Sequence, residues 1–219
     1  MKKFTLLTLL CCLVSNVYAN NISELNFDDA LLAIQQQWVE ANYVKTQKEQ
    51  KNDFTELQQQ SKQLTVEFPD HAEAWIWHGI VQSSFAGAKG GLGALSLADD
   101  AKSAFEKALS LDETALQGSA HTSLGILYLK VPGWPLSFGD DDKSEQHLQA
   151  AVKMNPTGID INYFLAEFYL EQDQYEKAKE HLLLAQAAPQ RVNRASADKF
   201  RQQEVLVLLA KVNKSIAKH

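Results

Sequence analysis

The sequence predicts an all-α solenoid, in which pairs of antiparallel helices stack side by side along one axis. The composition favours helices, because Ala, Leu and Gln are abundant whereas Gly and Pro supply only 10 and 5 of the 219 residues. Apolar residues recur at helical spacing and seldom alternate as they do in half-buried strands. One helix pattern also returns three times along the chain, which is typical of repeat proteins.

The chain begins with the features of a secretory signal peptide. Two early lysines precede an apolar run at 4–14, and Ala19 provides a small residue at a cleavage site. The run is too short to span a membrane, and no later apolar run approaches that length. We therefore expect a signal peptide at 1–19 and a single exported domain at 20–219, located in the periplasm.

The two cysteines favour cleaved export over a lipid anchor. Cys11 and Cys12 lie inside the apolar run of the signal, and Leu10 is not the small residue that lipid attachment requires before Cys11. Cleavage leaves a mature chain without cysteine, whose stability we expect to come from a packed core instead of disulfides.

The charge balance argues against one class of partner. The formal net charge is −6, and removal of residues 1–19 takes away two lysines and no acid, which makes it −8. Binding to nucleic acid needs clustered Lys and Arg that displace counterions. We therefore expect no nucleic-acid partner.

Four helix pairs and one final helix are expected along the mature chain. A degenerate pair covers roughly 27–50 and 52–67, and three clear pairs follow between 71 and 190. A last helix at roughly 195–216 should cap the stack, as the end of a solenoid requires. The residues expected on its packed side are Val205, Leu208, Leu209, Val212 and Ile216.

The three clear pairs share one packing pattern. Each second helix carries a large apolar residue, at Phe105, Leu148 and Leu182, with a small residue four positions before it and another three positions after it. Each first helix carries a small residue, at Gly79, Gly125 and Ala166. Small residues let two helices approach closely, and the large residue fills the gap between them.

Two of the pairs contain insertions between their helices. The spacing from Ala166 to Ala178 is 12 residues, but from Gly125 to Ser144 it is 19 and from Gly79 to Ala101 it is 22. We expect irregular connections there, at 86–98 and 131–143. The aspartates near the end of each insertion fit the capping of the following helix, and the D-x-D-x-D-G pattern of a Ca²⁺ loop is missing.

The pattern of bulky residue, Leu-Gly, Tyr, Ala, Phe, Ala and Pro over residues 71–190 resembles the tetratricopeptide repeat (TPR) family. This resemblance implies a right-handed solenoid whose first helices line a concave groove. The groove positions carried over from the family are Ile76, Ile80, Ser83, Thr122, Ile126, Leu129, Tyr163, Glu167 and Leu170. Two alternatives stay open: the groove binds a partner, or a terminal helix fills it and these residues are ordinary core.

Residues 134–171 also resemble the periplasmic T-components of TRAP-type transport systems. The run Pro-Leu-Ser-Phe-Gly-Asp, a helix ending in Asn-Pro, and the run Gly-Ile-Asp-Ile-Asn-Tyr-Phe carry this resemblance. It implies an exported protein that binds a partner protein or a small apolar ligand.

The second insertion contains the residue with the most ambiguous role. Trp134, between Gly133 and Pro135, is either a buried plug over the helix pair or an anchor at the groove rim, and burial is favoured. Together with Trp134, the side chains of Leu136 and Phe138 are expected to fold the insertion onto the repeat.

Catalysis and cofactor binding have little support in the sequence. The mature chain lacks a nucleophilic cysteine, a G-x-S-x-G elbow, a P-loop and an H-E-x-x-H motif. We expect His147 and His181 to be exposed, and His78 and His121 to meet across neighbouring units in a structural role. The sequence therefore predicts a non-catalytic adaptor without metal or cofactor that binds a protein partner. The alternative is a T-component-like carrier that binds a small apolar ligand and docks a periplasmic binding protein.

Overall fold

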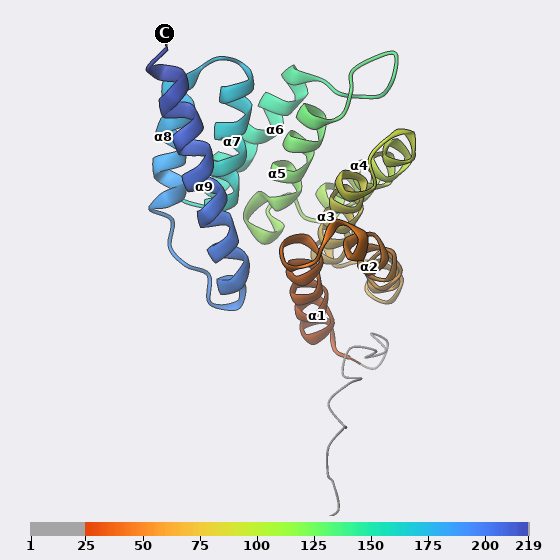
Figure 1. Ribbon diagram of the computed structural model, residues 1–219. Coiled ribbons are helices and arrows are strands. Elements are labelled where there is room, and N and C mark those ends of the chain that lie inside the picture. Colours follow the sequence, from red (N-terminus) through yellow and green to blue (C-terminus); the bar gives the residue numbers. More distant parts are fainter. Residues whose placement is uncertain (1–24, 219) are drawn as a thin grey trace, which may run out of the picture.

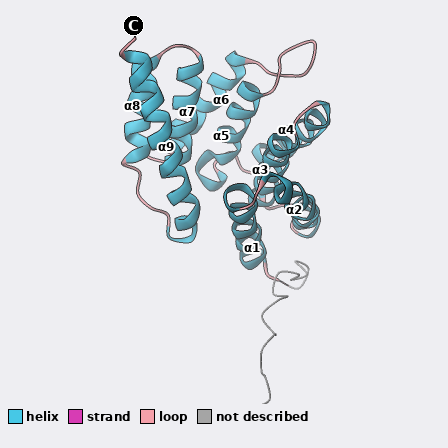
Figure 2. Ribbon diagram, in the orientation of Figure 1, coloured by secondary structure: helices cyan, strands magenta, loops and turns pink. Residues whose placement is uncertain are grey.

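The computed structural model describes residues 25–218, which form helices joined by short connections (Figures 1 and 2). The signal peptide predicted at 1–19 lies outside these residues. The helices are α1 (Phe27–Val39), α2 (Gln47–Glu67), α3 (Ala72–Lys89), α4 (Leu92–Leu111), α5 (Ala115–Lys130), α6 (Asp141–Met154), α7 (Ile159–Glu171), α8 (Tyr175–Gln186) and α9 (Ala195–Ile216). A π-helical turn, η2 (Glu40–Val44), follows α1, and a 3-10 turn, η3 (Val192–Arg194), precedes α9.

The helices form two layers of a solenoid. Within the pairs, α3 packs on α4, α5 on α6 and α7 on α8. Across the pairs, α1 contacts α3, α3 contacts α5, α5 contacts α7 and α7 contacts α9, so the odd-numbered helices form one layer. The fold class predicted from the sequence, an α-solenoid of helix hairpins with a C-terminal helix, is confirmed.

The N-terminal pair differs from its prediction at one boundary. The first helix was expected to continue to residue 50, but η2 ends at Val44 and α2 begins at Gln47. The break follows from a capping box, in which the hydroxyl of Thr46 donates to Glu49 Oε2 over 2.6 Å and Glu49 also accepts from the backbone N–H of Thr46.

The close contacts predicted inside the helix pairs are present. A Cβ atom at Gly79 would lie 2.5 Å from Cε1 of Phe105, and one at Gly125 would lie 2.6 Å from Cγ of Leu148. In the third pair the small residue is Ala166, fully buried in the same core cluster as Leu182. The glycines therefore set how closely the first two pairs pack.

The first insertion is not an irregular connection, and that prediction was wrong. Helix α3 continues to Lys89 and α4 begins at Leu92, so the extra residues lengthen both helices. The turn consists of Gly90 and Gly91, with φ of +66° and +64°. These are left-handed conformations that glycine adopts without steric cost.

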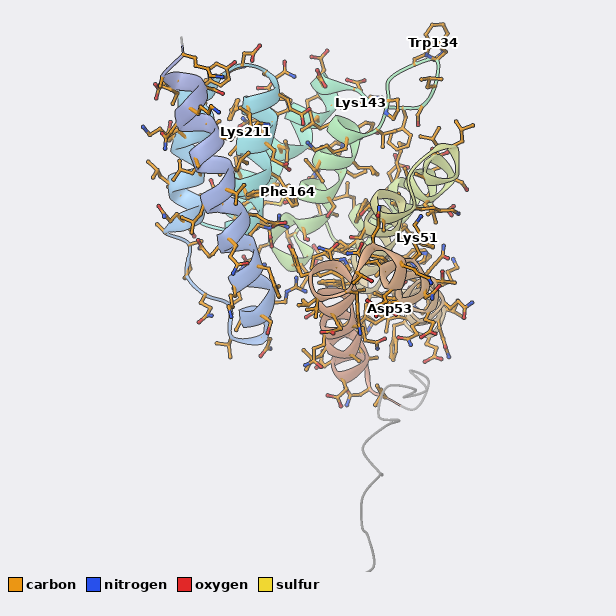
Figure 3. All side chains as sticks on the ribbon, viewed as in Figure 1. Lys51, Asp53, Trp134, Lys143, Phe164 and Lys211 are labelled. Atoms are coloured by element: carbon orange, nitrogen blue, oxygen red, sulfur yellow. The ribbon has the colours of Figure 1, made fainter. Side chains whose placement is uncertain are left out.

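The second insertion forms an ordered loop, as predicted, but its tryptophan is exposed. The predicted burial of Trp134 is wrong, because its side chain is 90% exposed at the tip of the loop (Figure 3). Leu136 is exposed as well, whereas Phe138 packs edge-on against Tyr128 with ring centroids 5.6 Å apart. Among the apolar side chains at 134–138, only Phe138 packs against the repeat.

The last helix occupies the predicted residues and caps the stack. Its Val205, Leu208 and Val212 are buried in the C-terminal core cluster with residues of α7 and α8. Leu209 and Ile216 are half-buried against the same cluster. Helix α9 thus takes the place that the first helix of a further pair would have.

Candidate functional site

The predicted groove residues lie on α3, α5 and α7, but two of them belong to the core. Ile76 is fully buried against α4 and α5, and Thr122 is buried with its hydroxyl near the carbonyl of Gly118. Neither is accessible to a partner, because neighbouring repeats already cover them. The remaining predicted positions are half-buried: Ile80, Ser83, Ile126, Leu129, Tyr163, Glu167 and Leu170.

Helix α9 covers Tyr163 and Phe164 of α7. The guanidinium group of Arg201 lies 4.5 Å from the ring centroid of Tyr163 and 4.6 Å from that of Phe164. Burial raises the pKa of the Tyr163 hydroxyl. The alternative that a terminal helix fills the groove is therefore correct for Tyr163.

The two ends of the solenoid meet across the odd-numbered layer. Tyr43 of η2 stacks on Phe200 of α9, with ring centroids 4.7 Å apart and planes 7° apart. Its hydroxyl donates to Glu204 Oε2 over 3.3 Å, and burial raises the pKa of Tyr43 to about 12. Because the ends approach each other on this side, the odd-numbered layer is the concave one.

A second contact joins the ends through an arginine on two tryptophans. The guanidinium group of Arg194 lies 4.5 Å from the ring of Trp77 on α3 and 5.8 Å from that of Trp38 on α1. Its Nη1 is buried without a hydrogen-bond partner, and desolvation lowers the pKa of Arg194 to about 10. Attraction to the faces of the two rings compensates for part of this desolvation.

An ion-pair network fixes the start of α9. Asp160 accepts from Arg201 Nε over 2.9 Å and lies 2.9 Å from Arg191 Nη1, while Asp198 accepts from the backbone and side chain of Arg191. Burial alone would raise the pKa of Asp160, but the charges of Arg201, Arg191 and Arg194 lower it to about 2. This network holds α9 against the first turn of α7.

These contacts between the ends were not predicted from the sequence. They join Trp38, Tyr43 and Trp77 to residues 194–204, and nothing in the repeat pattern pairs such distant positions. The sequence offered one indication of these contacts, which is the group of three arginines and one phenylalanine at 191–201, near the start of the last helix.

A cleft of about 680 Å³ opens beside this closure, between α1, α2 and the start of α9. Polar and apolar groups contribute about equally to its lining, and the polar part comes from glutamines of α1, acids of η2 and α2, and side chains around η3. The polar residues are Gln35, Gln36, Gln37, Glu40, Lys45, Asp53, Glu56, Asn193, Arg194 and Ser196. Such a lining does not match a small apolar ligand.

The predicted groove residues that α5 and α7 bring together form a patch that we name the α5–α7 face: Ile126, Leu129 and Lys130 of α5 with Glu167, Leu170 and Glu171 of α7. Leu129 and Leu170 pack partly against the C-terminal core cluster, so Ile126 is the apolar residue of this face outside the core clusters. Lys130 forms an ion pair with Glu171 and lies 3.7 Å from Glu167 Oε1, so a charged rim bridges the two helices. Burial raises the pKa of Glu167 against the opposing effect of Lys130. Ile126 lies on α5 one turn before that lysine.

The histidines are placed differently from their prediction. His78 and His121 do not meet, because His78 is buried with Nδ1 3.0 Å from Ser61 Oγ, whereas His121 Nδ1 lies 2.8 Å from Nδ1 of His147. His147 and His181 are half-buried instead of exposed. His147 stacks on Tyr128 and His181 on Tyr169, so all four hold helices together.

The aspartates of the second insertion have separate tasks. Asp140 caps α6 by accepting from the backbone N–H of Lys143 over 3.0 Å, and Asp141 accepts from Gln172 Nε2 over 3.0 Å. The capping prediction is confirmed for Asp140 and is wrong for Asp99 and Asp100 of the first insertion, which lie inside α4. Residues 25–218 contain no group of three or more His, Cys, Asp or Glu arranged to hold a metal ion.

None of the helices in residues 25–218 combines the length and the apolar character needed to cross a membrane.

Comparison with known proteins supports the repeat type. Residues 136–199 match a tetratricopeptide repeat family. The chain resembles the crystal structure of a thermophilic TPR protein of Thermus thermophilus, with a TM-score of 0.53 and 16% identity over 83% of this chain and 91% of that one. Two crystal structures of MamA give TM-scores of 0.44 and 0.43 at 19% identity, over 80% and 87% of this chain and 97% and 94% of theirs. No curated protein sequence matches.

Proposed function

We propose that this chain, whose repeats are of the tetratricopeptide type, is an exported, non-catalytic adaptor that binds a partner protein through its α5–α7 face. TPR repeats generally serve as protein-interaction scaffolds, which supports a protein partner. The proposal further states that the chain is exported, that it binds through this face and that it has no catalytic activity.

The composition of the α5–α7 face carries the proposal. Ile126 is half-buried and lies outside the four core clusters of the described residues, beside the charged rim formed by Lys130 with Glu167 and Glu171. Ile126, together with the half-buried edges of Leu129 and Leu170, gives a short apolar strip bordered by charges. Such a strip fits the apolar side of an amphipathic helix, whose polar side would face the rim.

Export is supported by the first residues of the chain. The basic start, the apolar run at 4–14 and Ala19 together have the order and size of a secretory signal. Such a signal directs the mature chain to the periplasm. The absence of cysteine after residue 12 suits that compartment, because no thiol is exposed to oxidation.

The T-component-like carrier remains a weaker proposal. The cleft of about 680 Å³ has as much polar as apolar lining, including five charged side chains, whereas sites for small apolar ligands are predominantly apolar. A transport system as the partner is compatible with the adaptor proposal.

The test is an Ile126→Arg substitution in the tagged mature chain, used to capture partners from periplasmic extract. A charge placed in the apolar strip should lower partner recovery roughly tenfold or more, because a desolvated, unpaired charge opposes binding. Helical content and the midpoint of urea unfolding should stay at wild-type values, because Ile126 is outside the core clusters.

The matched control is Val207→Arg, which adds the same charge at a 73% exposed apolar position of α9. It should leave partner recovery unchanged. Equal recovery by wild type and Ile126→Arg would contradict the proposed face, and a large loss of stability in that variant would assign Ile126 to the core.

A further inference from the structure

The connection between α5 and α6, which we name the α5–α6 loop (residues 131–140), presents a large apolar side chain to solvent. Trp134 is 90% exposed and Leu136 is 70% exposed. The loop projects beyond the ends of the helices, and Trp134 points away from the helical body (Figure 3). The three other tryptophans are half-buried or buried, so Trp134 is the exception within this chain.

A tight neck holds the α5–α6 loop in its shape. The backbone N–H of Gly139 donates to the carbonyl of Pro132 over 2.9 Å, and that of Asp140 donates to the carbonyl of Tyr128 over 3.1 Å. Any Cβ atom at Gly139 would lie 1.9 Å from the carbonyl oxygen of Val131, so the two sides of the neck touch. Inside the tip, the N–H groups of Leu136 and Ser137 both donate to the carbonyl of Gly133.

The base of the loop is anchored separately from its tip. Phe138 packs on Tyr128, and the ammonium group of Lys102 lies 5.8 Å from the Phe138 ring. Because Phe138 satisfies the packing of the loop, Trp134 and Leu136 are not needed to hold it down. The loop therefore keeps its shape while these two side chains stay exposed to solvent.

A rigidly displayed tryptophan is a strong binding element. It can bury about 150–250 Å² on a partner, and a preformed loop loses little conformational entropy when it does so. Tryptophan is also among the side chains that most often dominate the binding energy of protein interfaces.

The charges around the loop indicate what the partner must look like. Asp140, Asp141 and Asp142 follow the tip directly. Of the neighbouring lysines, Lys143 lies 3.7 Å from Asp140, Lys102 is paired with Glu106, and Lys130 is paired with acids of α7. Asp142 is exposed. The base of the loop is therefore acidic, which opposes contact with an anionic lipid surface and favours a basic one.

We propose that the α5–α6 loop is a second binding surface, which inserts Trp134 into an apolar pocket on a partner protein whose rim carries Lys or Arg. This surface lies at an edge of the solenoid and is formed by other residues than the α5–α7 face. The chain then joins two surfaces of one assembly, one at the concave layer and one at the edge.

The proposal is tested by replacing Trp134 with the photo-crosslinking residue p-benzoylphenylalanine in the full chain, exported by the cells that naturally contain it. Irradiation should give an adduct with another protein, and mass spectrometry should map the crosslink to an apolar pocket bordered by Lys or Arg. With that partner purified, Trp134→Ala should weaken binding roughly tenfold or more. Asp142→Lys should weaken it several-fold, and the effect should shrink as salt is added.

The control places the same crosslinker at Val207, an exposed apolar position of α9, which should not give this adduct. Trp134→Ala should fold like wild type and should still capture the partner that Ile126→Arg loses, which separates the two proposals. Absence of a protein adduct, an adduct with a second copy of this chain, or a crosslink outside a basic-rimmed apolar pocket would each overturn the inference. A blue shift of tryptophan fluorescence on vesicles of phosphatidylethanolamine and phosphatidylglycerol, present in the wild type and absent in Trp134→Ala, would also overturn it.

Discussion

The α3–α4 and α5–α6 hairpins carry related insertions and make different structures from them. The stretch Leu-Ser-Leu-Ala-Asp-Asp-Ala-Lys-Ser at 95–103 is helical throughout, whereas Leu-Ser-Phe-Gly-Asp-Asp-Asp-Lys-Ser at 136–144 is loop until Asp140 and helix only afterwards. The first hairpin thus extends its helices, and the second displays a loop.

Glycine and proline explain the difference. Just before 95–103, at 86–94, the chain has four glycines but no proline, and only the adjacent Gly90 and Gly91 leave the helical conformation, so one turn suffices and helix resumes at once. The second insertion contains Pro132 and Pro135, which cannot donate backbone hydrogen bonds, and Gly133 and Gly139, which form its neck. Similar capping chemistry therefore does not imply similar structure when helix breakers precede it.

The largest difference that can be tested concerns the histidines of the two hairpins. His78 of α3 is buried beside Ser61, and burial lowers its pKa to about 4, whereas His121 of α5 is bonded to His147 of α6. The ordinary histidine pKa is about 6.5, so the unfolded chain binds a proton at His78 that the folded chain does not. Stability from this site is present above a pH of about 6.5 and is lost as the pH falls towards the folded-state pKa of about 4.

We therefore expect that His78→Gln, which does not titrate, removes on the order of 3 kcal/mol of acid destabilisation between roughly pH 7 and pH 4. The measurement is urea unfolding of both proteins across this range. Above neutral pH the two stability curves should run parallel, which serves as the internal control. A constant difference between the curves throughout the acidic range would show that His78 is not buried in neutral form.

The next effect concerns the contact points of the pairs. Gly79→Ala brings a Cβ atom to 2.5 Å from the Phe105 ring and should lower the free energy of unfolding by roughly 1–3 kcal/mol. Adding Phe105→Leu makes an Ala–Leu pair like Ala166 and Leu182 of the third unit, and should recover part of the loss. The midpoints of urea unfolding, at unchanged m-value, measure the loss in the single variant and the recovery in the double variant. Equal stability of the two variants would show that the Gly79–Phe105 contact is not equivalent to the Ala166–Leu182 contact.

The smallest effect tests whether the first insertion is helical. Gly87 lies inside α3, and a Cβ atom added there would meet no other atom within 4 Å, so Gly87→Ala should raise the free energy of unfolding by up to about 1 kcal/mol. Gly90→Ala, at φ +66° just beyond the helix, should lower it by about 1 kcal/mol. Thermal unfolding of both variants is sufficient. Effects of the same sign at both positions would mean that no helix end separates them.

The repeat pattern predicted the helix pairs and their contact points because both depend on local spacing. A small residue on one helix and a large one on the next, as at Gly79 and Phe105, set a contact that spacing alone reveals. Helix α9 was also predictable, since its apolar side repeats every three or four residues.

The candidate site was predicted less well because burial there depends on distant parts of the chain. Ile76 is apolar on a first helix, as a groove residue would be, and only the packing of α4 and α5 shows that it is core. Trp134 was expected to be buried because large aromatic residues usually are. Its exposure depends on the neck at Gly139, which the sequence does not make visible.

The contact between the two ends of the solenoid changes how its stability is distributed. In an open repeat array each unit depends on its nearest neighbours, and the outermost units fray first. Here Tyr43, which follows the first helix, stacks on Phe200 of the last helix, and Arg194, just before the last helix, lies over Trp38 of the first. These contacts make the two ends of the array neighbours. Local opening at either terminus then breaks contacts at the other, so the array behaves as a closed cooperative unit whose ends are protected together.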